Sequence, residues 1–254
     1  MGEEKKNAAG NQSVSRALAI MDLLATGPLG VRQVAKQLGF APSIAQRLLA
    51  TMCSAGYLEQ RESDARYCIG YKAFQVGTTF ASQNDLHSLV MPELEALAEQ
   101  HVTGFLGVLR NATIVYVLAV EGTGPVAVKR QPGTVTHAHS TALGKALLSG
   151  YSDQEIRDLL PKKFPQLTPN TTTSLDSLLK EIAQIRLDGY ALNDQENRLG
   201  VFSVGAVIRD ARGRPVAALS GALPSNLVDD SNKQETIKAV VEAAQRISRR
   251  LGCP

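Results

Sequence analysis

The sequence is poor in cysteine and has no long apolar run, and each scarcity excludes a class of protein. The three cysteines among 254 residues form neither a paired framework nor a CxxC motif, so a disulfide scaffold and a zinc knuckle have no support. No uncharged apolar stretch approaches the ~20 residues of a membrane-spanning helix, and the N-terminus shows no apolar secretory core. We therefore expect a cytoplasmic protein without a membrane segment.

Net charge is also small, but it is unevenly placed. Charged residues make up 20% and hydrophobic residues 44% of the chain, which is typical of a globular protein with room for two domains. Residues 1–76 contain nine Lys or Arg and six Asp or Glu, whereas residues 77–254 contain eighteen of each. The whole excess of +3 therefore lies in the first third, where contact with nucleic acid is favoured.

Turn residues divide the first third into short helices. Apolar spacing and glycine or proline stops predict three helices, over residues 13–24, 31–38 and 42–54. Two short β-prone runs around a polar tip follow, at 57–60 and 67–70. This order predicts a winged helix-turn-helix over residues 13–76, after a disordered tail of residues 1–12.

In such a motif the outward face of the second helix enters the major groove of double-stranded DNA. There Arg47 can bridge O6 and N7 of guanine, Gln46 can pair with adenine, and Ile44 can meet a thymine methyl group. The predicted DNA-binding residues are Arg32, Lys36, Ser43, Ile44, Gln46, Arg47, Thr51, Arg61 and Arg66. A helical hairpin used only for protein contacts is the alternative, and the clustering of positive charge with the motif favours DNA.

Helices and strands alternate in the rest of the chain. Residues 77–90 predict a linker helix, and another helix is expected to begin at Pro92. Strands are expected at 105–109, 114–120, 190–193, 201–208 and 216–220, and a last helix from residue 231. Because hairpin turns join neighbouring strands, we expect an antiparallel sheet and an α+β fold, with a second domain over residues 91–254.

No constellation of catalytic residues is present. The sequence has no GxSxG, Gly144-Lys145 lacks the upstream glycine of a P-loop, and the His137/His139 pair has no acidic cluster beside it. We therefore predict no enzyme, no metal and no other cofactor. A helix start at Ser140-Thr141-Ala142 leaves the backbone N–H groups of Thr141 and Ala142 available to a carboxylate, although a plain capped helix is the simpler alternative.

The order of these parts resembles the isocitrate lyase regulator (IclR) family of bacterial transcription factors, from about residue 13 to residue 252. The supporting runs are Val14 to Ile20, Arg47 to Thr51 with Gly56 to Leu58, Arg66-Tyr67 with Ile69-Gly70, His139 to Leu148, Asp194 to Asn197 with Leu199 to Val201, and Arg209 to Ser220. Several motifs in the same order make the resemblance specific.

The resemblance implies a winged helix-turn-helix, a linker helix and a GAF-like domain whose antiparallel sheet binds a small-molecule effector. It further implies homodimers or homotetramers on palindromic operators. By position, the effector-binding residues would be Thr141, Ala142, Asn193, Ser203 and Ser220.

Three departures from the family pattern bear on the effector. Asn193 stands where an acidic side chain is common, Phe202-Ser203 replaces an Arg-Cys pair, and Ala222 replaces a second serine. They indicate a less charged pocket, which favours an aromatic or larger carboxylate over a small hydrophilic acid such as glyoxylate. The alternative reading of the whole chain is a DNA-binding protein whose second domain is an enzyme or needs no ligand.

Overall fold

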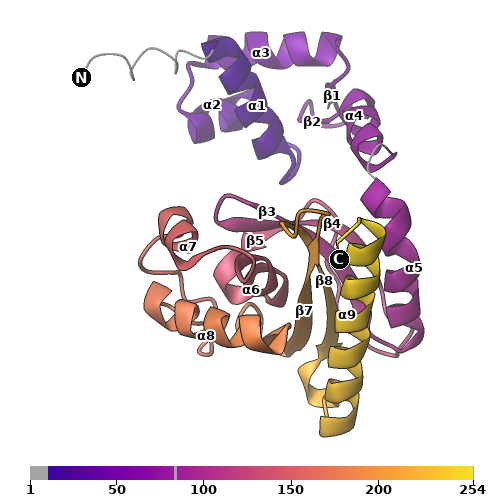
Figure 1. Cartoon of the computed structure of the whole chain (residues 1–254). Coiled ribbons are helices and arrows are strands. Elements are labelled where there is room, and N and C mark those ends of the chain that lie inside the picture. The colour runs from indigo at the N-terminus through magenta and orange to yellow at the C-terminus, as the bar shows by residue number, and fades with distance from the viewer. Residues whose placement is uncertain (1–10, 83–84, 254) are drawn as a thin grey trace. The chain divides into compact units, whose positions relative to one another are not determined.

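The computed structural model describes residues 11–82 and 85–253, and its elements are labelled in Figure 1. The helices are α1 (Gln12–Leu24), α2 (Val31–Leu38), α3 (Pro42–Ser54), α4 (Tyr71–Ser82), α5 (Asp85–Glu99), α6 (Ala142–Leu148), α7 (Asp153–Leu159), α8 (Leu175–Asp188) and α9 (Asp230–Arg250). The strands are β1 (Leu58–Gln60), β2 (Tyr67–Ile69), β3 (Thr103–Arg110), β4 (Thr113–Val120), β5 (Val135–His137), β6 (Ala191–Asp194), β7 (Val201–Arg209) and β8 (Pro215–Pro224). Contacts divide the chain into two compact units, residues 1–84 and 85–254.

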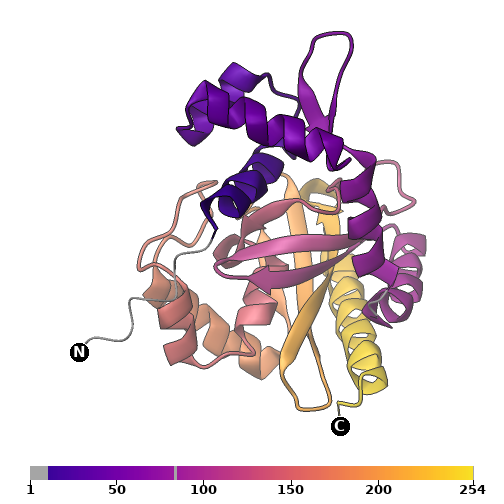
Figure 2. The ribbon, with the colours of Figure 1, turned by 90° about the horizontal axis from the view of Figure 1, so that it is seen from above.

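The first unit is the predicted winged helix-turn-helix. Gly39 ends α2 in the left-handed conformation, with φ +67°, and Pro42 occupies the first turn of α3, where its missing N–H costs no helical bond. Ile20, Val34 and Leu49 lie in a core shared by α1, α2 and α3. Strands β1 and β2 pair in antiparallel register, and Figure 2 shows this hairpin projecting from the unit.

Three helix starts differ from the expected ones, and the last helix, α9, begins one residue early at Asp230 because Asp229 caps it. Helix α1 begins at Gln12, because the side chain of Asn11 accepts a hydrogen bond from the Ser13 N–H and caps it. Pro92 does not start a helix but lies inside α5. The helix extends ahead of the proline because Val90 is fully buried in the same core as Leu94, which offsets the lost backbone bond.

The predicted tail and linker are only partly described. Residues 1–10 of the tail and residues 83–84 of the linker lie outside the described residues. The described part of the linker is helical, in α4 and in the first turns of α5. On α4, Tyr71, Phe74 and Val76 are all more than half exposed.

The second unit is built on one antiparallel sheet of six strands, in the order β5-β4-β3-β8-β7-β6, which confirms the α+β class. Two strands are longer than expected. Strand β3 begins at Thr103 instead of Phe105, and β8 runs to Pro224 instead of ending at Ser220. Most of β8 is buried without alternation, because both faces of the sheet are covered. Such a strand lacks the period of two by which strands are found.

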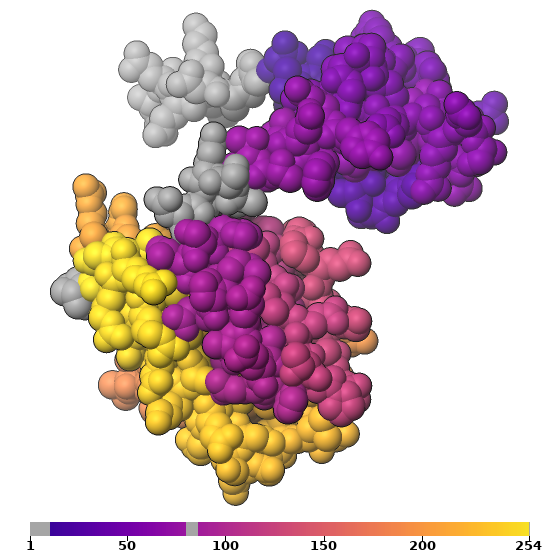
Figure 3. Space-filling view, turned by 90° about the vertical axis from the view of Figure 1, so that its right-hand side faces the viewer, coloured from indigo at the N-terminus to yellow at the C-terminus, as the bar shows by residue number. Residues whose placement is uncertain are grey.

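Helices cover the two faces of this sheet in separate layers. Helices α5 and α9 pack on one face, and α6, α7 and α8 lie on the other (Figure 1). Figure 3 shows α9 and α5 next to one another on the surface of this unit. No helix in the described part of the chain is both long and apolar enough to span a bilayer.

Two glycines let α6 approach its neighbours at backbone distance. A Cβ on Gly205 of β7 would lie 2.6 Å from the carbonyl carbon of Ala142, and a Cβ on Gly144 would overlap the backbone of Ala138. A side chain at position 205 would push α6 off the sheet, and one at position 144 would push α6 away from the turn at Ala138. This contact holds the start of α6 against β7 and so fixes one wall of the pocket described next.

Candidate DNA-binding face and ligand pocket

The outward face of α3 carries the predicted base-reading residues. Ser43, Gln46, Arg47 and Thr51 are exposed and Ile44 is half-buried, because Ala45, Leu49 and Met52 turn inward to the core. The Thr51 hydroxyl donates to the carbonyl of Arg47 at 2.9 Å, so it offers a partner only its lone pairs. The helix therefore presents the flexible Arg47 and Gln46 side chains to the outside.

Basic side chains flank this face. Arg32 and Lys36 on α2 and Arg61 and Arg66 at the tip of the hairpin are all exposed. Among the described residues only Arg66 of these four forms an ion pair, with Asp64 at 3.7 Å. The other three charges are free to meet phosphate groups.

The second unit holds a pocket between the sheet, the start of α6 and two loops. Its lining residues are Phe105, Tyr116, Val128, Arg130, Thr141, Ala142, Leu143, Asn193, Asn197, Arg198, Val201, Ser203, Ser220 and Ala222. All five predicted effector-binding residues are among them, although they come from four separate elements, the start of α6 and the strands β6, β7 and β8. Phe105 and Tyr116 meet edge to face, with ring centroids 5.4 Å apart, and form an aromatic wall.

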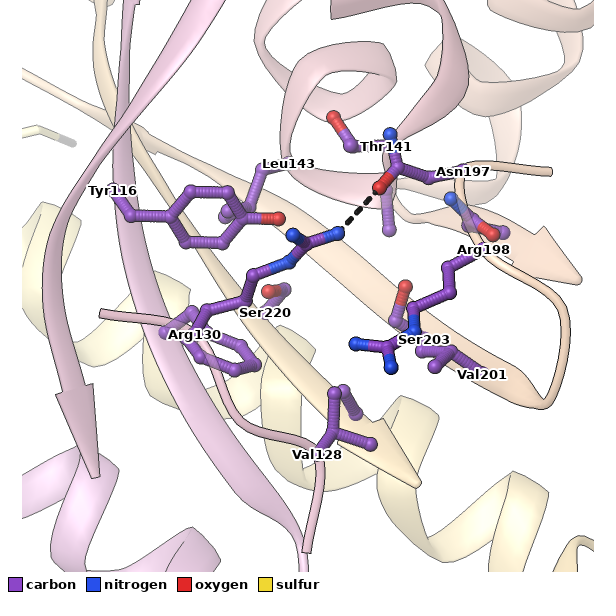
Figure 4. Close-up of a pocket in the computed structure, with 14 residues that line it drawn as sticks. Tyr116, Val128, Arg130, Thr141, Leu143, Asn197, Arg198, Val201, Ser203 and Ser220 are labelled. Carbon is purple, nitrogen blue, oxygen red and sulfur yellow. Dashed lines mark hydrogen bonds between the residues drawn. The ribbon is translucent and has the colours of Figure 1, made fainter. Parts of the chain in front are cut away.

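Two arginines in this lining were missed by sequence reasoning. Arg130 lies between β4 and β5, and Arg198 lies in the loop between β6 and β7. Figure 4 shows Arg130 reaching Asn197, to whose Oδ1 its Nη2 donates at 2.8 Å. Neither guanidinium has an ion pair within the described residues, and no Asp or Glu lines the pocket. The expectation of a weakly charged pocket did not include these two cations, because loop residues carry no periodic signal.

Several donors in the pocket have no partner. The hydroxyl groups of Ser203 and of the buried Ser220 form no hydrogen bond in the part of the chain that is described. Thr141 caps α6 by accepting from the Gly144 N–H at 3.0 Å, as expected. The backbone N–H groups of Thr141 and Ala142 have no acceptor among the described residues.

Asn193 differs from the other predicted effector-binding residues, because its amide is already occupied. Its Nδ2 donates to the carbonyl of Ser140, and its Oδ1 accepts from the Glu196 N–H at 3.1 Å. The side chain therefore ties β6 to the start of α6 and has little capacity left for a ligand. Burial raises the pKa of the Tyr116 hydroxyl, against the opposing effect of Arg130, so this phenol remains a donor.

Three charged side chains, Lys145, Glu181 and Glu196, form an ion triad that stabilises the elements around the pocket. Lys145 on α6 is fully buried, and its Nζ lies 2.5 Å from Oε1 of Glu181 and 2.6 Å from Oε1 of Glu196. Burial raises the pKa of the Glu196 carboxyl, while Lys145 acts in the opposite direction. Glu196 directly precedes Asn197 and Arg198, so the triad anchors the loop that carries two pocket residues. A lysine inside the apolar run of residues 142–148 is the one signal of this triad in the sequence.

His139 has a structural role in the core of the second unit. It is 2% exposed and stacks on Phe164 with ring centroids 4.4 Å apart, whereas His137 is exposed. Burial lowers the pKa of His139 from its ordinary 6.5 to about 4. Among the described residues, no three His, Cys, Asp or Glu side chains gather closely enough to hold a metal ion.

A recognition helix in one unit and a polar pocket in the other define a transcriptional regulator that responds to a small molecule. Residues 13–62 match the IclR helix-turn-helix domain and residues 78–249 match the bacterial transcriptional regulator IclR C-terminal domain. The chain therefore belongs to the IclR family of bacterial transcriptional regulators, which confirms the resemblance seen in the sequence.

Individual relatives agree along nearly the whole chain. The glycerol operon regulatory protein of Streptomyces coelicolor is 31% identical over 246 residues, which cover 95% of this chain and 96% of that protein. The crystal structure of an IclR regulator from Alicyclobacillus acidocaldarius superimposes with a TM-score of 0.86 at 22% identity, over 94% of this chain and 98% of that one. An IclR homolog from Microbacterium hydrocarbonoxydans, complexed with 4-hydroxybenzoate, gives 0.82 at 19% identity, over the same shares. These two structures share the fold.

We predict that His139 makes the stability of the protein depend on pH. The unfolded chain takes up this proton near pH 6.5 and the folded chain only near pH 4, so the unfolded state binds more protons between these values. The free energy of unfolding should be fully present above pH 6.5 and should fall by up to about 3 kcal/mol toward pH 4. Denaturant titrations of wild type and His139→Gln across this range measure the difference.

The exposed neighbour provides the control for this experiment. His137→Gln removes an exposed ring whose centroid lies 5.4 Å from that of His139, and it should change the pH profile far less than His139→Gln does. Parallel profiles for wild type and His139→Gln would show that the buried ring does not contribute.

We predict that Lys145→Met destabilises the protein by about 3–5 kcal/mol, because it leaves the Glu196 carboxylate buried without its cation. The double variant Lys145→Met/Glu196→Gln should recover part of this loss, since the remaining side chains carry less uncompensated charge. Urea unfolding followed by circular dichroism measures both. Lys180→Met, an exposed lysine one residue before Glu181, should change little, and an equally small effect at Lys145 would contradict the role of the triad.

Proposed function

We propose that this protein regulates transcription by reading an operator with α3 and by binding a carboxylate effector in the pocket of its second unit. The division of labour follows the predicted domains: residues 13–76 bind DNA, residues 77–90 connect, and residues 91–254 bind the effector. The main support for a carboxylate effector is the lining of the pocket, which contains two arginines and no acidic side chain.

The recognition helix supports the first half of this proposal. Its exposed face offers Gln46 and Arg47 for base edges, with Ser43, Ile44 and Thr51 around them. Arg32, Lys36, Arg61 and Arg66 lie outside this face and would contact phosphate groups. The described residues contain one such helix, so a palindromic operator would be read by a homodimer or homotetramer.

The pocket supports the second half. Unpartnered donors on Ser203, Ser220 and the backbone of Thr141 and Ala142 suit the oxygens of an acid, and Asn193 would hold the wall in place. The aromatic pair Phe105 and Tyr116 suits a flat apolar body. The homolog complexed with 4-hydroxybenzoate binds a ligand of this kind, which supports an aromatic or larger carboxylate here.

Regulation would follow from a shift between two populations. An effector that binds one arrangement of the protein better than another favours that arrangement, and operator affinity then changes by the same factor. We further infer that the protein acts in the cytoplasm as a repressor without an enzymatic activity, because its relatives are named as regulators and repressors and its pocket lacks a nucleophile with an adjacent base.

We predict that Arg47→Ala weakens binding to the operator by about 1–3 kcal/mol and relaxes preference at one base pair, because a bidentate contact with guanine is lost. Lys36→Ala, on the neighbouring helix, should weaken binding to all sequences alike and lower the salt dependence by about one ion. Fluorescence anisotropy with duplexes selected from a random pool measures both. A uniform loss for Arg47→Ala would make it a phosphate contact.

We predict that carboxylates stabilise the second unit and their neutral amides do not. At a hundred times the dissociation constant a ligand should add about 2.7 kcal/mol to the free energy of unfolding. Thermal unfolding with benzoate, 4-hydroxybenzoate and the corresponding amides tests the class, and Arg130→Gln should weaken the acids at least tenfold. Arg157→Gln, which removes an exposed arginine on α7, is the control; equal stabilisation by acids and amides would contradict the proposal.

A further inference from the structure

The two arginines of the pocket exceed what one carboxylate requires. A single carboxylate is saturated by the two parallel N–H groups of one guanidinium. Here Arg130 and Arg198 both line the pocket, come from different loops, and extend toward the same hollow in Figure 4. Without a ligand their like charges face one space with no carboxylate in the lining to separate them.

The loops hold Arg130 in a defined position. Asn197 accepts from Arg130 at 2.8 Å and donates its own Nδ2 to Thr136 at 2.9 Å and to the Ser140 hydroxyl at 3.1 Å. Because Arg198 is the next residue after Asn197, the same loop places both guanidinium groups. That loop is anchored in turn by Glu196 on Lys145.

Arg198 also lies between the pocket and a second, outer groove. Val128, Arg198 and Val201 line both the pocket and an outer groove, which continues to Leu199 and Pro224. The pocket itself contains the unpartnered hydroxyl of Ser220, whose residue is 3% exposed. A ligand with one polar group inside and a second group at Arg198 would therefore fit the lining better than a ligand with one polar end.

We infer that the effector is a dianion, namely a dicarboxylate whose two groups pair separately with Arg130 and Arg198. This inference rests on the proposed role of the pocket as an effector site. The carbon skeleton between the two groups would lie against Phe105, Val128 and Leu143. A dicarboxylate also balances the charge of both guanidinium groups, whereas a monoanion leaves one of them unbalanced in the pocket.

Matched pairs of acids test this inference on the full-length protein. Terephthalate, isophthalate, succinate and adipate are each compared with their monomethyl ester, which keeps the skeleton and removes one charge. Titration calorimetry should find at least one diacid that binds ten times more tightly than its monoester. Arg198→Gln should raise the dissociation constant of that diacid at least tenfold and leave its monoester within twofold.

Two controls test whether diacid binding is specific to Arg130 and Arg198. Arg212→Gln, which removes an exposed arginine in the turn between β7 and β8, should bind the diacid like the wild type. Sulfate at the same concentration should not compete with the diacid; full competition would mean an unspecific anion site and would overturn the inference.

The remaining outcomes separate this inference from the proposed function. If acids bind but diacid and monoester differ by less than twofold, or if Arg198→Gln leaves the difference intact, the effector is a monoanion and the pocket keeps its proposed role. If no acid of either kind binds, the dianion and the carboxylate effector are both wrong.

Discussion

The arrangement of the second unit depends on the burial of α6. All seven residues of this helix are buried, Lys145 included, and its backbone touches the sheet where Gly205 leaves room. A fully buried ammonium group is costly unless it is paired, so Lys145 requires the carboxylates of Glu181 and Glu196. These two acids lie on α8 and in the loop after β6, and the demand of one lysine thereby ties three segments together.

The geometry of the pocket depends on this packing of α6 and on the contacts of Lys145. The start of α6 supplies Thr141 and Ala142, and the loop fixed by Glu196 supplies Asn197 and Arg198. Asn193 completes the framework, since both ends of its amide are used within the protein. The side chains that support the walls are thus distinct from those left free for a ligand, such as the hydroxyl of Ser220.

Charge is used differently in the two units. In the first unit Arg47 and the basic residues that flank it are exposed to solvent, where they can meet a phosphate backbone. In the second unit Arg130 and Arg198 lie in a pocket lined by both apolar and polar side chains, where a cation interacts more strongly with an anion because less water screens it. Nine basic residues in the first third predict the former, whereas the balanced charge of the remainder conceals the latter.

The amino-acid sequence by itself determined the helix-turn-helix, the wing, the antiparallel sheet and the family. These features depend on local spacing and on turn residues such as Gly39 and Pro42, which act within a few residues along the chain. The sequence also placed Thr141, Ser203 and Ser220 in one site, through motifs whose order the family shares. It did not predict that one helix runs through Pro92. That helix extends ahead of the proline because Val90 is buried in a core most of whose other residues are distant in the sequence.

Only the tertiary structure brought Arg130 and Arg198 into the pocket and joined Lys145 to Glu196. Each of these contacts connects residues separated by dozens of positions along the chain, and no local pattern encodes such a distance. Physically, the strands and the close approach of α6 to β7 place these side chains together, and burial then makes their charges matter. The sequence therefore defined which kind of protein this is, and the packing of one buried helix decided how its pocket is charged.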